Sequence, residues 1–470
     1  MKIEQIYTGC LAEAAYYIES NGEAAIIDPL REVSTYLKKA EKAGAKIKYI
    51  FETHFHADFV SGHVDLAEKS GAEIIYGPTA KTEFKSHIAK DGEQFKIGAL
   101  TITALHTPGH TLESTTYLLT DENGKDYCIF SGDTLFIGDV GRPDLAQKGQ
   151  LTMEDLAGML YDSLNEKIKP LADDVIVYPA HGAGSACGKS MSKETFDTLG
   201  HQKEVNYALK AQTKEQFITE VTDGILSPPQ YFAKNAAINK GGIESIDEVY
   251  EKGLIALTPQ EFEHLANQTG AVMLDTRDPQ VFAKGFIPNS INIGLNGQFA
   301  PWVGALITDL KQPILLITDE GKEQETITRL TRVGYDSSIG YLNGGFQRWT
   351  DAGNEIDTIE SISAEDFEKA SNENDIIAID VRKPGEYESE HLDFTLSRPL
   401  DFINDWTSEI DPKSTYYIHC AGGYRSMIAA SILKSRGAEH VIDVAGGYAA
   451  IKNTGLKTTD FACPSKAMKV

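Results

Sequence analysis

The sequence is poor in cysteine and has no long apolar run, and each shortage excludes a class of protein. Five cysteines are scattered over 470 residues. An odd, dispersed set forms no disulfide framework and is typical of a reducing cytoplasm. No apolar run approaches the roughly 18 residues of a membrane-spanning helix. The start, MKIEQIYTGCLAEAAYYIES, lacks the basic segment and apolar core of a secretory signal. We therefore expect a cytoplasmic protein.

Basic residues are also scarce relative to acidic ones. Lys and Arg number 44 against 69 Asp and Glu, which gives a formal net charge of −25. A surface this negative repels phosphate backbones and anionic lipids, so neither nucleic acid nor a membrane is expected as a partner. With 41% hydrophobic and 24% charged residues, the composition is that of a soluble globular protein, and the length suggests about three domains.

Short apolar runs alternate with helical patterns over residues 1 to about 240. The runs at 47–54, 100–110, 127–136 and 174–182 are predicted strands, and each leads into a His, Asp or Gly. This alternation predicts an α/β fold whose functional residues lie on loops at the strand ends.

Residues of metal-ligand type gather at these strand ends. A single histidine would most simply be a surface residue or a hydrogen-bonded core residue. Several such motifs, on strands whose ends converge at one edge of a sheet, indicate instead a shared metal site. The residues concerned are His54, His56, Asp58, His110, Asp133 and His181.

This series resembles the metallo-β-lactamase fold, whose members carry HxHxDH and then His, Asp and His at such loops. The resemblance implies an αββα sandwich over residues 1–245. One position departs from the pattern, because Phe59 follows Asp58 where the two-metal hydrolases of this fold have a histidine. A phenyl ring cannot coordinate a cation, so a mononuclear site is favoured. Two imidazoles with one carboxylate suit non-haem Fe(II) and oxygen activation.

The motifs HFHADFVSGH, TPGHT, SGDTLF and GDVGRPDL resemble, more narrowly, the persulfide dioxygenase branch of this fold. That resemblance implies mononuclear Fe(II) held by His54, His110 and Asp133. Spacing alone does not distinguish this set from one in which His56 replaces Asp133. The same resemblance implies that His56, Asp58 and His181 support the ligands or face dioxygen.

Two more residues of this half are candidates for the site. Arg142, in GRPD, matches the arginine of the branch by motif and is expected to orient the substrate or the loop, although it could be a solvated turn residue. Cys187 lies six residues after His181 and could accept sulfur beside the iron, with Lys189 favouring its thiolate. A small buried residue in a tight turn is the equal alternative for Cys187.

The Pro-, Gly- and Asn-rich stretch 227–242 is interpreted as the boundary of the first domain, and an internal repeat follows it. Three landmarks recur 101 to 105 residues apart. They predict two further domains, 246–356 and 357–470, each of an ordinary domain size. The matched pairs are Asp275 with Asp380, Asp319 with Cys420, and Gly344 with Gly446.

In the second copy, an apolar run ends at Cys420 and leads through AGGY into a helical segment. Backbone N–H groups of such a loop and helix start point at one spot, where they stabilise a thiolate or the terminal sulfur of a persulfide. Arg425 would attract an anionic donor such as thiosulfate. An unreactive buried cysteine is the alternative. The loop residues expected to bind substrate are Gly422, Gly423, Tyr424 and Ser426.

The C-x-G-G-x-R-S loop, with IDVRKPGEYESEHL before it and VAGGY after it, resembles the rhodanese family over about 361–470. The first copy is rhodanese-like in pattern but has Asp319 and Gln324 in place of Cys420 and Arg425. A carboxylate cannot carry sulfane sulfur, so this copy is expected to be catalytically inactive.

The remaining residues singled out by the sequence have structural interpretations. Asp380 and Arg382 are expected to form a scaffold ion pair. Cys10 and Cys128 lie in or beside apolar strands and are assigned to packing. Cys463, in the tail, carries no specific signal.

Together these features predict a bifunctional enzyme of sulfide detoxification, in the form of a homo-oligomer. Iron would oxidise a low-molecular-weight persulfide with O2 to sulfite. The persulfide would be of the glutathione, coenzyme A or bacillithiol type. The Cys420 domain would move sulfur among persulfide, sulfite and thiosulfate. The alternatives are a zinc-dependent thioester hydrolase like glyoxalase II fused to a sulfur carrier, and a non-enzymatic sulfur carrier or sensor with a structural metal.

Overall fold

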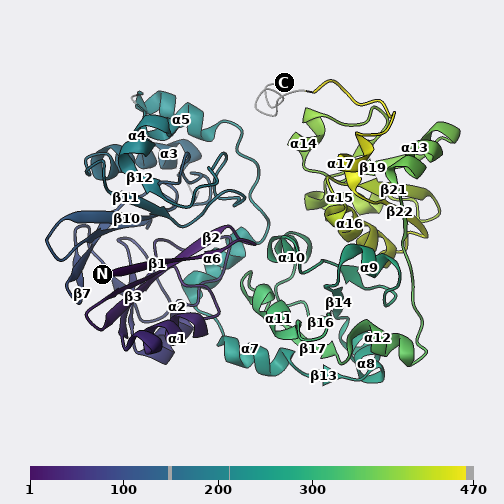
Figure 1. Cartoon of the computed structure of the whole chain (residues 1–470), viewed down its shortest axis with the longest axis horizontal. Helices are drawn as coiled ribbons and strands as arrows, with labels where there is room; N and C mark the ends of the chain where they lie inside the picture. The colour runs from purple at the N-terminus through teal and green to yellow at the C-terminus, as the bar shows by residue number, and fades with distance from the viewer. Residues whose placement is uncertain (147–150, 211, 462–470) are drawn as a thin grey trace. The chain divides into compact units, whose positions relative to one another are not determined.

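A computed structural model describes residues 1–146, 151–210 and 212–461 (Figure 1). By its internal contacts, the chain divides into two compact units. The first unit comprises residues 1–246 with 331–334, and the second comprises 247–330 with 335–470. Cys463 lies outside the described residues. Over the described ranges, no helix combines the length and the apolar character needed to cross a bilayer.

Two six-stranded mixed sheets form the centre of the first unit. The first sheet has the order β1 (Lys2–Thr8), β2 (Glu13–Ser20), β3 (Glu23–Ile27), β4 (Lys46–Phe51), β5 (Glu73–Tyr76) and β6 (His87–Ile88). The second has the order β12 (Asp197–Thr198), β11 (Ile176–Pro179), β10 (Asp126–Gly132), β9 (Thr115–Thr120), β8 (Leu100–His106) and β7 (Gln94–Ile97).

Both faces of these sheets are buried, which explains why the strands read as continuous apolar runs. In β3, Ala25 and Ile27 face the core between the sheets, while Ala24 and Ile26 pack against the helices on the outer face. Neighbouring side chains of a strand point to opposite faces, so a strand covered on both sides needs apolar residues at every position. The arrangement is therefore helix, sheet, sheet, helix, as the sequence predicted.

Helices cover the outer face of each sheet. Tyr36 and Ala40, one turn apart, are buried against the first sheet, and Leu160 belongs to the cluster that covers the second. The helices are α1 (Ser34–Ala43), α2 (His63–Ser70), α3 (Met153–Ser163), α4 (Leu199–Val205), α5 (Lys214–Thr222) and α6 (Phe232–Gly241).

Residues 227–242, which composition suggested as the boundary of the first domain, lie near the end of the first unit's main stretch, which runs to Ile246. These residues include α6, which packs into the first unit with the Asn235 and Asn239 side chains fully buried. Asn and Gly are poor helix formers, so composition did not indicate this helix. Tertiary contacts outweigh that preference here.

The second unit contains two five-stranded sheets with the same strand order, which is the structural form of the sequence repeat. Every strand pair in them is parallel. The first sheet is β13 (Ala256–Leu257), β17 (Ser338–Leu342), β16 (Ile314–Ile317), β14 (Val272–Asp275) and β15 (Ile291–Asn292). The second is β18 (Glu360–Ile362), β22 (His440–Val444), β21 (Thr415–His419), β19 (Ile377–Asp380) and β20 (Leu396–Ser397).

Helices connect the parallel strands in the same sequence in both copies. After α7 (Ile246–Gly253), the first copy has α8 (Pro259–Thr269), α9 (Pro279–Ala283), α10 (Phe299–Leu306), α11 (Glu323–Thr331) and α12 (Gly345–Asp351). The second has α13 (Ala364–Glu373), α14 (Pro384–Ser389), α15 (Ile403–Trp406), α16 (Tyr424–Ser435) and α17 (Gly447–Ile451).

A buried ion pair recurs at the same place in both copies. Arg382 Nη2 lies 2.6 Å from Asp380 Oδ2, and its guanidinium stacks 3.9 Å from the Tyr448 ring centre. In the first copy Arg277 makes the same contact with Asp275, also at 2.6 Å. The pair holds the end of a strand to the following loop, which is the scaffold role that the sequence suggested for Asp380 and Arg382.

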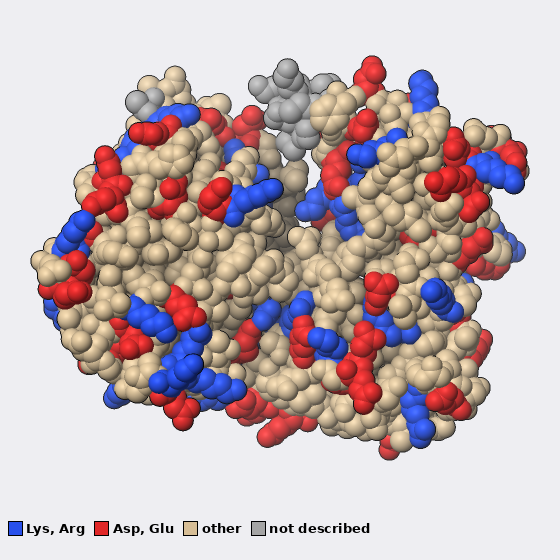
Figure 2. Space-filling model, viewed as in Figure 1, with Lys and Arg blue, Asp and Glu red and all other residues tan. Residues whose placement is uncertain are grey.

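Charged side chains of both signs cover the surface. On the face drawn in Figure 2, acidic and basic side chains are interspersed over both units.

Substitution of Gly447, in the turn after β22, tests how tightly the Cys420 loop is packed. A Cβ on Gly447, whose φ is +55°, would lie 2.3 Å from the Cys420 carbonyl oxygen, whereas a Cβ on Gly437, with φ of +98°, meets nothing within 4 Å. Gly437→Ala should cost only the backbone strain, about 1–3 kcal/mol. Gly447→Ala should cost clearly more, measured by urea unfolding of both variants. Equal losses would contradict the tight packing.

Candidate functional site

His54, His110 and Asp133 form a buried cluster at the strand ends of the first unit. One ligand-type atom from each lies within 4.8 Å of the others. The Nε2 atom of His110 is 3.3 Å from Asp133 Oδ2, and that of His54 is 3.8 Å from the same oxygen. Each residue is about 1% exposed. The structure thus brings together, in one group, the three residues that the family resemblance implied as ligands.

A chain of hydrogen bonds fixes the orientation of His54. Asp28 accepts the backbone N–H of Thr53 and its hydroxyl proton, both at 2.8 Å. The Thr53 hydroxyl has one proton, which it gives to Asp28, so at 3.0 Å it accepts from Nδ1 of His54. The proton therefore sits on Nδ1, and Nε2 presents its lone pair to the cluster. Second-sphere contacts of this kind are usual for metal-ligating histidines.

His110 is oriented by the backbone of Arg142. Its Nδ1–H donates to the Arg142 carbonyl oxygen at 2.8 Å, which leaves the Nε2 lone pair facing Asp133. The Arg142 guanidinium is itself occupied by a bidentate pair with Asp144 and by the carbonyls of Ala186 and Leu226. Of the two roles expected for Arg142, these contacts support orientation of the loop, because every nitrogen that could reach a substrate already has a partner.

The protonation states of the cluster suit a cation. Burial, with His56 nearby, holds the pKa of His54 well below its usual range, so the ring is neutral. Although burial alone would raise it, the surrounding His181, His54 and His110 hold the pKa of Asp133 well below its usual range. A neutral imidazole and an ionised carboxylate are the forms that bind metal.

Two of the inward-facing atoms have no partner in the protein. His54 Nε2 and Asp133 Oδ2 are buried without a hydrogen bond. Buried polar atoms without a partner are costly, and a metal ion would satisfy both at once. The donor set of two imidazoles and one carboxylate fits a divalent transition metal with coordination positions to spare.

His56 faces away from this group. Its Nε2 lies 3.0 Å from Asp28 Oδ1 and 3.7 Å from Glu52 Oε2, with which it forms a separate buried cluster. The ligand set in which His56 replaces Asp133 therefore does not appear among the tight groups of the described residues. His56 instead lies against Phe59, with ring centres 4.3 Å apart.

Asp58, His181 and Cys187 form a third buried group beside Phe59. His181 bridges two carboxylates, with Nδ1 2.7 Å from Asp133 Oδ1 and Nε2 2.7 Å from Asp58 Oδ2. Although burial alone would lower it, Asp133 and Asp58 raise the pKa of His181 well above its usual range. This position supports a role for Asp58 and His181 in holding Asp133 rather than in direct ligation.

The expected effect of Lys189 on Cys187 is wrong. The Lys189 ammonium donates to the backbone carbonyls of Glu220 and Asp223 and does not pair with the sulfur. Burial, followed by the nearby Asp58 and Asp133, raises the pKa of the Cys187 thiol well above its usual value. The protein therefore keeps this thiol protonated. Sequence proximity predicted the ammonium as neighbour, but the turn directs it to other carbonyls.

Sequence reasoning missed three residues that hold the site. Asp28 and Glu52 directly follow strands β3 and β4, which is the same signal that identified the histidines. Asn239, on α6, is the third. Its Nδ2 donates to the carbonyls of His56 and Phe59, and its Oδ1 accepts the N–H of Ser61, all at 2.8 Å. No local sequence signal could assign it, because the contact spans about 180 residues.

In the second unit, Cys420 lies at the end of β21 under the loop that begins α16. The N–H of Gly423 donates to Sγ at 3.1 Å, and Ser426 Oγ lies 3.6 Å from it. Gly423 has a φ of +100°, a conformation that side chains disfavour. The sulfur thus lies under a backbone N–H at the start of the twelve-residue α16, the place where the sequence predicted a cradle for a sulfur anion.

Arg425 does not present a free charge to this cradle. Its guanidinium forms a bidentate pair with Glu386 at 2.6 and 2.8 Å. The charge that was expected to attract an anionic donor is therefore largely balanced by a carboxylate.

The predicted match of Asp319 with Cys420 is wrong by one residue. Ile317 pairs with Asp275 as His419 pairs with Asp380, so the buried Thr318 takes the place of Cys420, and Asp319 is exposed beyond it. A threonine hydroxyl cannot carry sulfane sulfur either.

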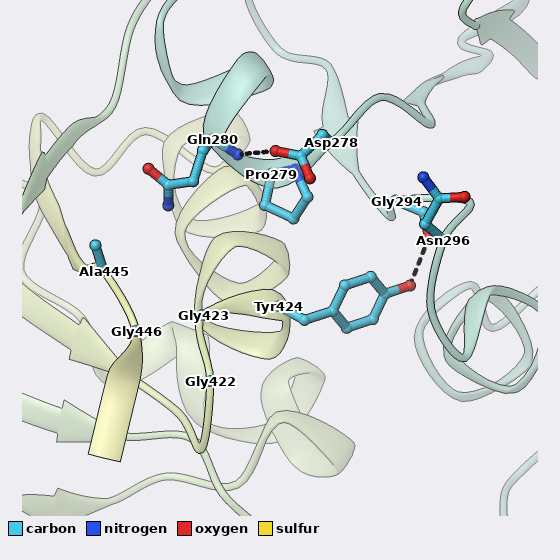
Figure 3. A pocket seen from close by; sticks show the side chains of 10 residues that line it. All are labelled: Asp278, Pro279, Gln280, Gly294, Asn296, Gly422, Gly423, Tyr424, Ala445 and Gly446. Carbon is cyan, nitrogen blue, oxygen red and sulfur yellow. Dashed lines mark hydrogen bonds between the residues drawn. The ribbon is translucent and has the colours of Figure 1, made fainter. Parts of the chain in front are cut away.

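A cavity of about 250 Å³ adjoins the Cys420 loop, and both copies line it. Figure 3 shows the Tyr424 ring extending from α16 toward the 294–296 loop of the first copy, where its hydroxyl donates to the Gly294 carbonyl at 2.7 Å. The lining residues are Asp278, Pro279, Gln280, Gly294, Asn296, Gly422, Gly423, Tyr424, Ala445 and Gly446.

Replacement of Asn239 tests whether α6 holds the metal loop. Asn239→Ala leaves two carbonyls and one N–H without their partner, at roughly 1–3 kcal/mol for each buried group. Asn239→Asp keeps the acceptor for Ser61 but turns a carboxylate oxygen toward the carbonyls. Both variants should lower the unfolding temperature and the bound metal per chain. Wild-type metal content in both variants would contradict this role of Asn239.

Comparison with known proteins gives the same division of the chain. The Metallo-beta-lactamase superfamily model matches residues 8–181, and the Rhodanese-like domain model matches 258–352 and 363–454. The first half of the chain is similar to two kinds of curated protein at equal identity. Hydroxyacylglutathione hydrolase cytoplasmic of Arabidopsis thaliana is 30% identical over 186 residues, 38% of this chain and 67% of that protein. Persulfide dioxygenase ETHE1, mitochondrial, of Mus musculus is 30% identical over 210 residues, 44% of this chain and 74% of that protein.

A solved structure extends the similarity beyond the first half. The crystal structure of a metallo-beta-lactamase from Staphylococcus aureus subsp. aureus COL is 33% identical, with a TM-score of 0.64, and the match covers 73% of this chain and 98% of that one. The chain belongs to the metallo-beta-lactamase superfamily and carries two rhodanese-like domains after its metallo-beta-lactamase domain.

Proposed function

We propose that the chain is a persulfide dioxygenase with a sulfurtransferase domain. The first unit would oxidise a low-molecular-weight persulfide with O2. One persulfide, one O2 and one water would give one thiol, one sulfite and two protons. The rhodanese-like domain with Cys420 would move sulfane sulfur among persulfide, sulfite and thiosulfate. The carrier thiol would be of the glutathione, coenzyme A or bacillithiol type.

The observation that carries this proposal is the composition of the buried cluster. His54, His110 and Asp133 offer two neutral nitrogens and one carboxylate oxygen, a set that suits Fe(II) with open positions. Phe59, fully buried against His56, stands where a further imidazole would assist a second metal. The similarity to persulfide dioxygenase and the rhodanese-like domains on the same chain both favour sulfur as the substrate.

In this proposal the residues around the cluster have distinct tasks. Ferrous iron held by His54, His110 and Asp133 would supply the electron transfer that joins O2 to sulfur. Thr53 keeps the proton on Nδ1 of His54, so that Nε2 stays free to bind. His181 holds a proton between Asp58 and Asp133 and is the acid placed closest to negative charge that develops on the product. The buried ring of Phe59 keeps water from that side.

The sulfurtransferase step uses Cys420 as the nucleophile. Its sulfur attacks the sulfane sulfur of the donor, the donor S–S bond breaks, and the thiol leaves with the bond electrons. The Gly423 N–H and the start of α16 stabilise negative charge on the sulfur that Cys420 then carries. Domains joined on one chain keep a product of one site at a high concentration near the other.

Metal analysis with oxygen uptake tests the dioxygenase. Protein purified without air should contain about one iron per chain and should consume O2 with glutathione persulfide. His110→Ala and Asp133→Ala should lose both the iron and the O2 consumption, because each removes one of the three donors. His201→Ala, an exposed histidine of the same unit, is the matched control and should keep both.

The same measurements separate the dioxygenase from the alternatives. Stoichiometric zinc, hydrolysis of a glutathione thioester and no oxygen uptake would instead indicate a hydrolase like the hydroxyacylglutathione hydrolases. A pair of bridged cations beside Phe59 would contradict the mononuclear site. A wild type that consumes no O2, with sulfur transfer unchanged in His110→Ala and Asp133→Ala, would indicate a sulfur carrier with a structural metal.

Cys420→Ser tests the second activity. Serine fits the same space but cannot carry sulfane sulfur, so sulfur transfer from thiosulfate or a persulfide should fall below detection. Oxygen consumption should remain largely intact, since the substitution leaves the His54 cluster unchanged. His110→Ala provides the reciprocal control and should keep sulfur transfer. Equal loss of both activities in Cys420→Ser would mean that the two sites act as one.

A further inference from the structure

A fully buried carboxylate lies behind the Cys420 loop. Asp443, on β22, is 0% exposed and accepts hydrogen bonds from three neutral groups. Ser426 Oγ donates to Oδ1 at 2.7 Å, and Ser361 Oγ donates to Oδ2 at 2.9 Å. The third donor, Nε2 of Gln280 at 3.0 Å, comes from α9 of the first copy. Burial of an ionisable group far from any cation is costly and calls for a functional reason.

Ser426 connects this carboxylate to the nucleophile. Its Oγ lies 2.7 Å from Asp443 Oδ1 and 3.6 Å from Cys420 Sγ. A serine hydroxyl has one proton and two lone pairs. Two acceptors lie near that proton, Asp443 Oδ1 at 2.7 Å and the Gly423 carbonyl oxygen at 3.2 Å. The shorter contact, to the carboxylate, takes the proton, so Ser426 faces Cys420 as an acceptor for its S–H. The three groups form a continuous path from the thiol to the carboxylate.

We propose that Asp443 accepts the proton of the Cys420 thiol through Ser426, and that the cysteine-free first copy supports this step by holding Asp443 with Gln280. The inference rests on the proposed sulfurtransferase function and deepens it. Asp443 and Ser426 act through Cys420 and are positioning residues for its chemistry. The first copy, which cannot carry sulfur itself, would thereby be part of the sulfur-transfer site.

The proton path balances without an added reactant. The S–H bond of Cys420 breaks as its proton passes to Ser426 Oγ, and the Ser426 proton passes to Asp443 Oδ1. The pair keeps one negative charge, which moves from carboxylate to sulfur. The thiolate forms a bond to the sulfane sulfur of the persulfide donor, and the donor thiol leaves as its anion. Asp443 returns its proton through Ser426 to solvent, and the leaving thiolate takes one up. No sulfur is oxidised or reduced overall.

The surroundings of the Asp443 carboxylate and of the Cys420 thiol suit a proton shared between them. Burial raises the pKa of Asp443, and the hydrogen bonds from Ser426, Ser361 and Gln280 oppose that rise. These three donors are uncharged, and they come from α16, β18 and α9. On the sulfur side, the nearby charged groups are Arg425, its partner Glu386 on α14, and Asp401. The negative charge can therefore move to the sulfur, to which the Gly423 N–H donates, while Asp443 becomes neutral.

Alkylation of Cys420 by iodoacetamide across a range of pH tests the relay without any sulfur donor. The rate is followed by mass spectrometry of the Cys420 peptide in the full-length protein. In the wild type, two coupled groups that share one proton should give a shoulder on the acid side of the profile. Asp443→Asn keeps the shape but cannot take the proton, so the shoulder should disappear and leave a single rise. A profile that matches the wild type would overturn the proposal.

Two further variants keep the test independent of folding defects. Ser426→Ala should also lose the shoulder, and Ser426→Thr, which keeps the hydroxyl, should restore it. At neutral pH the sulfur-transfer rate of Asp443→Asn should fall on the order of 10²-fold, the usual scale for loss of acid–base assistance. Loss of the shoulder in Ser426→Thr together with a wild-type profile in Asp443→Asn would assign the contacts to packing alone and overturn the relay.

Gln280→Ala tests the contribution of the first copy. Removing a donor to the ionised carboxylate raises the pKa of Asp443, so the acid limb of the alkylation profile should move to higher pH. Asn267→Ala, an exposed amide on α8 of the same copy, should leave the profile unchanged. A wild-type profile in Gln280→Ala would overturn the role of the first copy. Alkylation of Cys420 needs no sulfur donor, so it reports on the relay independently of sulfur transfer. A wild-type protein that shows the acid-side shoulder in its alkylation profile but transfers no sulfur would refute the proposed function and not the relay.

Discussion

The first unit keeps the imidazoles of His54 and His110 and the carboxylate of Asp133 buried and facing one another. The rest of the unit depends on holding these groups in place although His54 Nε2 and Asp133 Oδ2 have no hydrogen-bond partner in the protein. A buried carboxylate such as Asp133 is costly unless charge and hydrogen bonds surround it. His181 provides a proton on one side, and the lone pairs of His54 and His110 leave the other side open for a cation. Each ligand is fixed from behind, by Thr53 and Asp28 or by the Arg142 carbonyl. A metal ion would complete an arrangement that is otherwise unsatisfied.

In the second unit, too, a buried reactive-type atom is surrounded by fixed groups, but these are backbone groups in place of a metal. The loop after Cys420 directs an N–H at the sulfur, and the turn at Gly447 packs so closely beneath it that no side chain fits. The first copy keeps the strand order and the Asp–Arg pair of its neighbour while lacking its cysteine. Its loops line the cavity beside the reactive loop. One copy therefore carries the loop cysteine, and the other forms part of its surroundings.

Most of the candidate ligands could be predicted from the sequence because strand ends of a sheet converge at one edge. His54, His110 and Asp133 are far apart along the chain, yet each ends an apolar run, and that pattern survives folding. The same reasoning applied to Asp28 would have found it too. Asn239 and Gln280 could not be found in this way, because their partners lie about 180 and 163 residues away. The ammonium of Lys189 shows the converse, since nearness in sequence did not bring it to Cys187.

The strand ends of the first unit, the two copies of the second and the residue types available for chemistry could be read from the chain alone, because apolar periodicity and repeat spacing are properties of the sequence. The layers of the first unit were implied by the family resemblance. Only the tertiary structure decided which atom of each histidine faces the cluster, that the charge of Arg425 is balanced by Glu386, and that a glutamine of one copy reaches the carboxylate of the other. These outcomes depend on hydrogen-bond partners that folding supplies from distant segments. The sequence pattern identifies the residues, whereas the direction of a lone pair or a proton depends on the hydrogen-bond partners that pack against the side chain.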